Sequence, residues 1–119
     1  MATGASGAIR IEGATKVDNA GAAAASRLLA FPATLHTLSV FNTSGSTIFV
    51  QLFDAAAVPA DTAVPLISFE LLTVTGKQWT WPQGRQFATG IVVVSSSTGG
   101  TKTITGAVAL IDTTYRPKN

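Results

Sequence analysis

The segment at residues 40–54, VFNTSGSTIFVQLFD, constrains the fold more than any other part of the chain. In its second half, IFVQLFD (48–54), side chains alternate with the two-residue period of a β-strand. Both faces of this strand are largely apolar, so one face needs a packed sheet and the other face needs a covering neighbour. The small polar link NTSGS (42–46) predicts a turn that joins the two arms as a β-hairpin.

Short β-branched and aromatic runs separated by turn residues continue along the rest of the chain, and no segment shows a convincing helical period. The connection at 54–65 holds two prolines and is long for a hairpin loop, so we expect it to cross between sheets. The run GIVVVS at 90–95 predicts a central strand buried on both faces. Further strands are expected at 8–12, 27–31, 34–42, 66–75, 78–81, 85–89 and 102–112, with a turn at 82–84 and a frayed tail after residue 112.

Seven or eight strands without a helix predict an all-β fold, an antiparallel β-sandwich of jelly-roll type with an N-terminal arm. At 119 residues the chain fits a single domain overall. Within it we expect an arm with the first strands at 1–33 and the sandwich body at 34–119. In the arm, Ile9 and Ile11 alternate with charged residues, which predicts a strand that adds to the exposed sheet edge of a neighbour.

The composition combines 46% hydrophobic residues with only 12% charged residues, about half the charged share of an ordinary soluble domain. Such a surface is rich in serine and threonine, self-associated, or both. No apolar run approaches the roughly 20 residues of a membrane span, and the N-terminus lacks a secretory signal pattern. We therefore expect no membrane partner and synthesis in the cytoplasm.

The net charge of +2 and the sequence pI of about 9.4 raise the question of nucleic-acid binding. The lysines and arginines are scattered singly, without a run or stripe that follows a phosphate backbone. The distribution of charge therefore predicts no nucleic-acid partner.

Catalytic and metal-binding patterns are weak. His36 is the single histidine and no nucleophile-elbow sequence accompanies it, so it is expected to be an ordinary strand residue. The chain has no cysteine, and its carboxylates do not cluster in the sequence. These patterns predict a protein that is not an enzyme and that holds neither metal nor cofactor.

The densest aromatic group is Trp79, Trp81 and Phe87. Such a group fills a core, anchors a protein partner, or stacks on sugar rings, and the sequence leaves these three alternatives open.

Two longer segments carry a resemblance to a known group of proteins. VFNTSGSTIFVQLFDAAAVPADTAVPLISF (40–69) and GRQFATGIVVVSSSTGGTKTITGA (84–107) resemble small structural proteins of tailed bacteriophages that decorate or cement the capsid. The resemblance spans roughly residues 35–115 and leaves out the arm at 1–33. It implies a β-sandwich that forms trimers or dimers and binds the outside of a capsid lattice.

The function predicted from the sequence is therefore that of a virion structural protein, a decoration or cement protein on the capsid exterior. Its expected partners are the major capsid protein and further copies of itself, as a homotrimer rather than a dimer. The alternatives are a tail, neck or fibre component and a carbohydrate-binding module. The residues expected to contact a partner are Ile9, Ile11, Trp79, Trp81 and Phe87.

Overall fold

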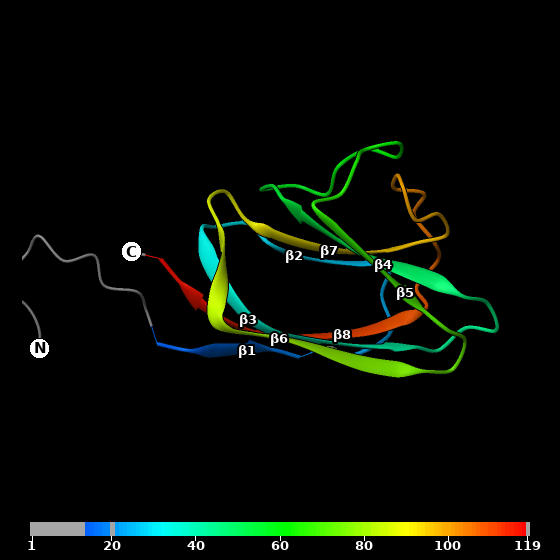
Figure 1. The fold of residues 1–119 in the computed structure, drawn as a ribbon, viewed down its shortest axis with the longest axis horizontal. Helices are drawn as coiled ribbons and strands as arrows, with labels where there is room; N and C mark the ends of the chain where they lie inside the picture. Colours follow the sequence, from blue (N-terminus) through cyan, green and yellow to red (C-terminus); the bar gives the residue numbers. More distant parts are fainter. Residues whose placement is uncertain (1–13, 20, 119) are drawn as a thin grey trace, which may run out of the picture.

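The computed structural model describes residues 14–19 and 21–118, and in these residues it contains eight β-strands and no helix (Figure 1). The strands are β1 (Lys16–Asp18), β2 (Ser26–Leu29), β3 (Ala33–Asn42), β4 (Ile48–Asp54), β5 (Ile67–Leu71), β6 (Gly76–Phe87), β7 (Ile91–Ser96) and β8 (Ala109–Pro117).

The strands form two antiparallel four-stranded sheets, ordered β1-β8-β3-β6 and β2-β7-β4-β5, which pack face to face (Figure 1). The first strand pairs with the eighth, the second with the seventh, the third with the sixth and the fourth with the fifth. This nested pairing is the strand order of a jelly roll. The predicted β-sandwich of jelly-roll type is therefore confirmed, whereas the predicted arm strand at 8–12 lies outside the described residues.

The strands before residue 33 are edge strands of the sandwich, β1 in one sheet and β2 in the other. Arg27 in β2 donates two hydrogen bonds, of 2.5 and 3.1 Å, to the carboxylate of Asp18 in β1. This ion pair joins the two sheets along one side. The division of the chain into 1–33 and 34–119 stays a prediction.

The predicted hairpin at 40–54 is wrong, because its two strands lie in different sheets. Residues 43–47 cross from one sheet to the other, and β3 pairs with β6 and β8 instead. An alternating pattern shows which side chains face the core, but it does not identify the strand that lies alongside.

Asn42 stabilises this crossing. Its fully buried side-chain amide donates to the carbonyl oxygens of Ser46, Leu71 and Leu72 at 2.8, 3.2 and 3.1 Å. Its side-chain oxygen accepts hydrogen bonds from the backbone N–H and the hydroxyl of Ser44. One side chain thus ties the crossing after β3 to the crossing after β5.

The prediction that residues 54–65 cross between sheets is also wrong. β4 pairs with β5 in one sheet, so the segment is a long loop that returns to the same sheet. The crossing occurs at 72–75, inside the segment that the sequence predicted as one strand at 66–75.

The turn predicted at 82–84 is part of β6, which continues through Pro82 and Gly84. β6 is an edge strand, where a proline removes no hydrogen bond from the ladder. The register with β3 shifts between Thr80 and Arg85, and Gly84 adopts a positive φ of 79° within this irregular stretch.

The last strand begins later than predicted and includes the tail that was expected to fray. β8 runs from Ala109 to Pro117 between β1 and β3, with Thr113 and Tyr115 buried in the sandwich. Alternate residues of β8 face the core, so this tail is a central strand.

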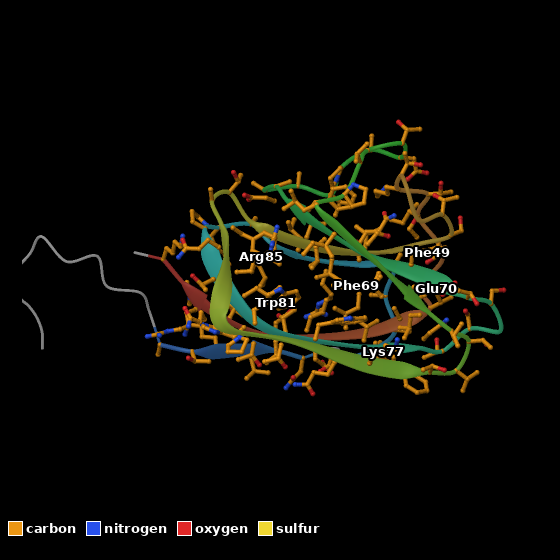
Figure 2. All side chains as sticks on the ribbon, in the orientation of Figure 1. Phe49, Phe69, Glu70, Lys77, Trp81 and Arg85 are labelled. Atoms are coloured by element: carbon orange, nitrogen blue, oxygen red, sulfur yellow. The ribbon has the colours of Figure 1, made fainter. Side chains whose placement is uncertain are left out.

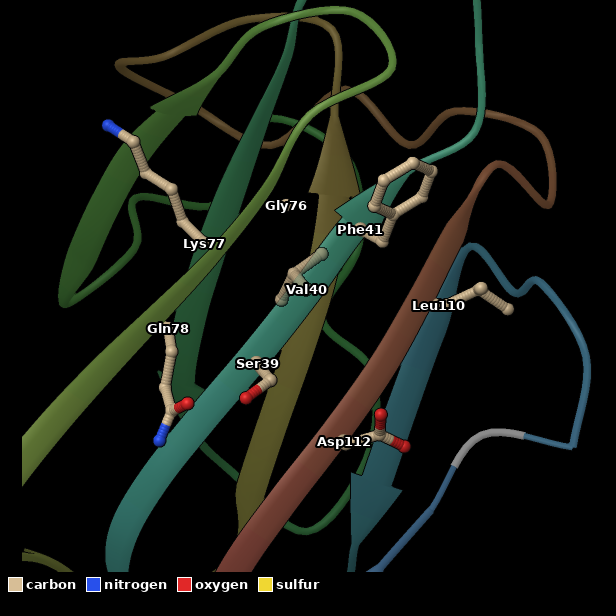
Figure 3. Close-up of a pocket in the computed structure, with 8 residues that line it drawn as sticks. All are labelled: Ser39, Val40, Phe41, Gly76, Lys77, Gln78, Leu110 and Asp112. Carbon is tan, nitrogen blue, oxygen red and sulfur yellow. The ribbon is translucent and has the colours of Figure 1, made fainter.

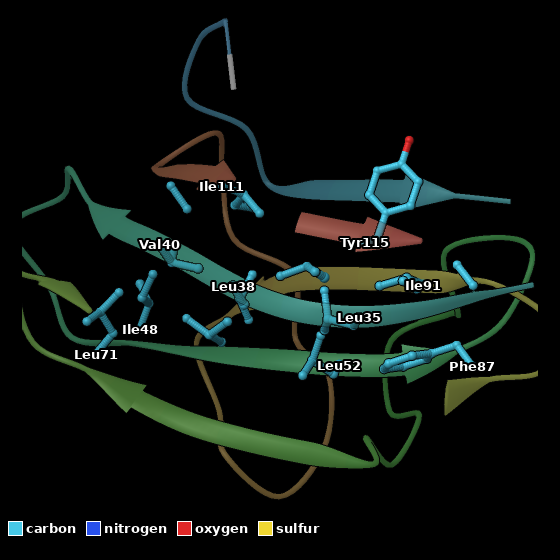
Figure 4. Packing of buried hydrophobic residues seen from close by; sticks show 14 residues of the cluster. Leu35, Leu38, Val40, Ile48, Leu52, Leu71, Phe87, Ile91, Ile111 and Tyr115 are labelled. Carbon is cyan, nitrogen blue, oxygen red and sulfur yellow. The ribbon is translucent and has the colours of Figure 1, made fainter. Parts of the chain in front are cut away.

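The main core lies between the two sheets (Figure 4). β7 is a central strand with all six residues buried, which confirms the prediction for the run at 90–95. The core is built from apolar residues of both sheets, among them Leu35, Leu38, Val40, Ile48, Val50, Leu52, Leu71, Phe87, Ile91, Val93, Ile111 and Tyr115.

Candidate assembly surface

The two tryptophans predicted to contact a partner, Trp79 and Trp81, lie on β6 and pack against the core. Trp81 points toward the space between the sheets (Figure 2). Trp79 stacks on Phe69 of β5, with ring centroids 4.4 Å apart and ring planes at 20°. Both Trp79 and Trp81 are half-buried and pack against the core. Core filling therefore accounts for much of their surface, and their contact with a partner stays a prediction.

Two other predicted contact residues, Ile9 and Ile11, lie outside the described residues. The fifth, Phe87, has an exposed fraction of 0% and belongs to the main core. A fully buried ring has no surface to offer a partner. The prediction for Phe87 is corrected accordingly, and the residue is a core residue.

The outer face of the β2-β7-β4-β5 sheet is covered by the chain itself. Two loops, 55–66 and 97–108, extend from the strand ends on this side of the sandwich (Figure 1), and we call them the loop cover. This is the covering neighbour that the apolar outer side of β4 requires. The outward apolar residues that form a second, smaller core are Phe53, Val92 and Val94, packed against Ala55 and Ala63.

The two loops of the cover are bonded to each other. The backbone N–H of Lys102 donates to the carbonyl of Ala63, and the N–H of Thr62 donates to the carbonyl of Lys102, both at 2.8 Å. The buried ammonium of Lys102 donates to the Asp61 carboxylate at 2.6 Å. The cover is therefore one connected layer.

A buried glutamine fastens the cover to the sheet beneath it. Gln51 of β4 has no exposed surface, and its amide donates to the carbonyls of Thr98, Gly99 and Thr101 at 2.9, 3.2 and 3.1 Å. The polar residue in the otherwise apolar pattern of β4 thus holds the second loop in place.

Two carboxylates near the cover have lowered pKa values. The hydrogen bond from Lys102 is the largest cause for Asp61, followed by the backbone N–H of Ile104. For Asp54, burial raises the pKa, but hydrogen bonds from the backbone N–H groups of Thr89, Ala88 and Gly90 outweigh this effect and lower the pKa overall.

Because the pKa values of Asp54 and Asp61 are lowered in the folded state, we expect the free energy of unfolding to fall in acid. A folded pKa below the ordinary value of 3.8 means that the unfolded chain takes up protons first as the pH falls. The stabilisation that the two ionised carboxylates give to the folded state is therefore complete above pH 3.8. It is lost as the pH falls through the lowered pKa values of the folded state. We expect urea unfolding to show a lower free energy of unfolding at pH 3 than at pH 6.

A double variant, Asp54→Asn with Asp61→Asn, is the control for this prediction. It should be less stable than the native chain at pH 6 and should lose less stability between pH 6 and pH 3. An unchanged pH dependence in the double variant would show that other carboxylates cause the acid sensitivity.

The outer face of the β1-β8-β3-β6 sheet differs, because no loop of the described residues lies over it (Figure 1). We call it the bare face. The strand registers arrange its outward side chains in rows that cross the sheet. The rows are Val17, Thr114, Thr37 and Thr80; then Asp112, Ser39 and Gln78; then Leu110, Phe41 and Gly76.

The bare face exposes two large apolar side chains and carries little charge. Val17 is 60% exposed and Phe41 is 39% exposed. Outward positions along β8 add Asp112 and Arg116, and the other outward positions of the rows are uncharged. Surfaces with exposed apolar groups and few charges are typical of the central part of protein interfaces.

A hollow of about 390 Å³ lies on the bare face between β3, β6 and β8 (Figure 3). Phe41 lies beside Gly76 of the neighbouring strand, where a Cβ atom would be 3.0 Å from the ring. The glycine therefore leaves room for the ring, which forms one wall. The hollow is lined by Ser39, Val40, Phe41, Gly76, Lys77, Gln78, Leu110 and Asp112.

The sequence did not identify the bare face, because half of its β8 residues lie in the tail that was expected to fray. The sequence does carry a strand pattern here, in which outward residues alternate with buried ones. The outward residues are Leu110, Asp112, Thr114 and Arg116. Threonine and charged residues at the outward positions made this stretch look like an unstructured end.

His36 lies in β3 where the register shifts against both neighbouring strands. It is half-buried, and the Gly84 stretch of β6 passes close to its ring. Within residues 14–19 and 21–118, no group of three or more histidine, aspartate or glutamate side chains is placed to hold a metal ion. The prediction that the protein is not an enzyme stays a prediction.

Comparison with known proteins adds little to what the structure itself shows. No protein-family model matches the chain, and no curated protein matches it. Among solved structures, the coat protein of tobacco streak virus is similar, with 11% sequence identity, a TM-score of 0.45, and an alignment that covers 88% of this chain and 85% of that one. No helix in the described residues is long and apolar enough to cross a membrane. The assignment of the fold therefore rests on this chain's own strand order.

Proposed function

We propose that this chain is a virion structural protein that decorates the head of a tailed bacteriophage and stabilises it by bridging neighbouring capsomers. The observation that carries the proposal is the bare face, a sheet surface with exposed apolar residues and few charges on a jelly roll whose other outer face is covered. The resemblance of residues 35–115 to capsid decoration proteins supports the same role.

The contrast between the two sheets supports the proposal that the bare face is a docking surface. The chain devotes 55–66 and 97–108 to covering the outer side of one sheet, and an ion pair from the buried Lys102 and a buried glutamine hold them. It provides no comparable cover, among the described residues, for Val17, Phe41 and Leu110 on the other sheet. A partner that packs there removes this apolar surface from water.

The proposed mechanism is thermodynamic linkage. A protein that binds the assembled lattice, and does not bind separated subunits, stabilises the lattice by mass action. The partners in this account are the major capsid protein and further copies of the chain, on the exterior of the capsid. The homotrimer favoured by the sequence remains a prediction.

The structure is compatible with a tail, neck or fibre component and disfavours a carbohydrate-binding module. A tail, neck or fibre component would use the same kind of surface, so the location in the particle distinguishes it from a head protein. A carbohydrate-binding module needs an open aromatic strip, whereas Trp79 and Trp81 are turned toward the core and Trp79 stacks on Phe69. This arrangement disfavours sugar binding.

Co-sedimentation with empty heads of the virus that encodes the chain tests the proposal and the surface together. Ser39→Arg places a long charged side chain on the bare face, and Val64→Arg is the matched control at a 76% exposed position of the loop cover. We expect the native chain and Val64→Arg to sediment with the heads and Ser39→Arg to bind roughly tenfold more weakly or worse. A native chain that stays in the supernatant contradicts the proposal. Equal binding of the two variants contradicts the assignment of the surface.

A further inference from the structure

We infer that two copies of this chain pack bare face against bare face about a two-fold axis near Thr114, so that Arg116 of each copy enters the hollow beside Asp112 of the other. The inference rests on the proposed role of the bare face in assembly and names a second copy as the partner that occupies it. In the co-sedimentation test above, Ser39→Arg then weakens binding to heads by separating the two copies, because a single copy lacks the avidity of a pair.

The first argument is the spacing of charges along β8. Asp112 and Arg116 both point outward, and each lies two residues from Thr114. At the rise of an extended strand they are about 13 Å apart. A two-fold axis through Thr114 that sets the two β8 strands antiparallel exchanges these positions. Each acid then meets the base of the other copy, which is the self-complementarity that a two-fold interface requires.

The second argument is the row of residues at the axis. Val17, Thr114, Thr37 and Thr80 lie side by side across the four strands, and none of them is charged. Short branched side chains of this kind let two sheets approach to about 10 Å, the spacing of packed sheets. The contact also removes Val17, which is exposed in the single chain, from water.

The third argument is the chemistry of the hollow, which suits a guanidinium group. Asp112 supplies a carboxylate that can accept two parallel hydrogen bonds, and the Phe41 ring supplies an aromatic wall (Figure 3). Ser39 and Gln78 add neutral polar groups along the floor. A planar, permanently charged group that pairs with carboxylates and stacks on rings is the best match to these walls.

Lys77 also lines the hollow and would repel a second cation, but its side chain extends away from Asp112 on the β6 side (Figure 3). Asp112 and Arg116 both interact within their own chain as well. The proposed contact therefore adds to existing interactions and does not depend on either group being unpaired.

The contact predicts a pair of subunits, in place of the trimer that the sequence favoured. In this contact the β8 strand of each copy supplies both the acid and the base, so both pairs are satisfied by two copies and no site is left for a third. A three-fold ring would instead bring two different surfaces together.

Charge reversal tests the inference, with sedimentation equilibrium as the readout. The native chain should have the mass of a dimer. Asp112→Arg and Arg116→Asp each bring like charges together at both ends of the axis and should weaken the dimer by roughly tenfold or more. The double variant with both changes restores opposite charges and should recover the dimer. Glu70→Lys, a charge reversal at an exposed position of β5 in the other sheet, should leave the dimer unchanged.

Thermal unfolding followed by circular dichroism shows whether each variant is folded, and recovery in the double variant separates a lost contact from a lost fold. A native monomer, a native trimer, or single variants that stay dimeric would each overturn the inference. A monomer that still sediments with heads overturns the two-fold contact and leaves the proposed function standing. A dimer that does not bind heads contradicts the proposed function alone.

Discussion

Replacing Phe87 by alanine should lower the free energy of unfolding by about 3–5 kcal/mol, the range measured for aromatic residues removed from protein cores. Phe87 is fully buried at the end of β6 and packs within the main core between the sheets. The substitution removes the ring and leaves a cavity that the two sheets cannot close without distortion. Urea unfolding at neutral pH measures the difference.

Phe31→Ala is the matched control, since this phenylalanine is 37% exposed and contacts Tyr115 in a tilted ring pair. Its loss should cost about 1 kcal/mol, the scale of one exposed aromatic pair. Similar costs for the two variants would contradict the placement of Phe87 in the core. They would also reopen the earlier prediction that Phe87 contacts a partner.

Replacing Asn42 by alanine should lower the free energy of unfolding by about 2–4 kcal/mol, because buried polar groups left without partners cost about 1–3 kcal/mol each. The side chain bonds to three carbonyl oxygens and to Ser44. These bonds hold together the two segments that carry the chain from one sheet to the other. The variant should therefore lose stability without any change in the surface of the strands.

Asn42→Asp separates the role of the amide donors from the role of side-chain shape. The carboxylate keeps the size of the native side chain but directs oxygen atoms at the carbonyls of Ser46, Leu71 and Leu72. We expect this variant to be at least as unstable at pH 7 as Asn42→Ala. A native-like free energy of unfolding for Asn42→Asp would show that these hydrogen bonds do not secure the crossings.

The sequence predicted most strands and the fold class because alternation and turn residues are local signals. The apolar run at 90–95 predicted the central strand β7. The alternating pattern at 48–54 predicted β4 and indicated that its outer side must be covered. Pairing between distant strands has no local signal, so the hairpin at 40–54 and the crossing at 54–65 were both wrong. Strict alternation also puts Leu35 and Leu38 on opposite faces, whereas the register shift at His36 brings both into the core.

The candidate surface was less predictable than the fold. Clustered aromatic residues in a sequence suggest a binding surface. In this structure, however, Phe87 is a core residue and Trp79 of the edge strand β6 stacks on Phe69. The bare face consists largely of threonine, serine and isolated apolar residues, which look the same in sequence whether or not a loop covers them. Its exposure depends on where the loops 55–66 and 97–108 lie, and both lie over the opposite sheet.

The most direct test of the central claim is quantitative mass spectrometry of purified virions of the phage that, under the proposed function, encodes this chain. The account predicts that the chain is present in intact heads separated from tails, in a fixed ratio to the major capsid protein that does not change on repeated purification. A chain that is found only in the soluble fraction of infected cells, or only in the separated tails, would contradict it.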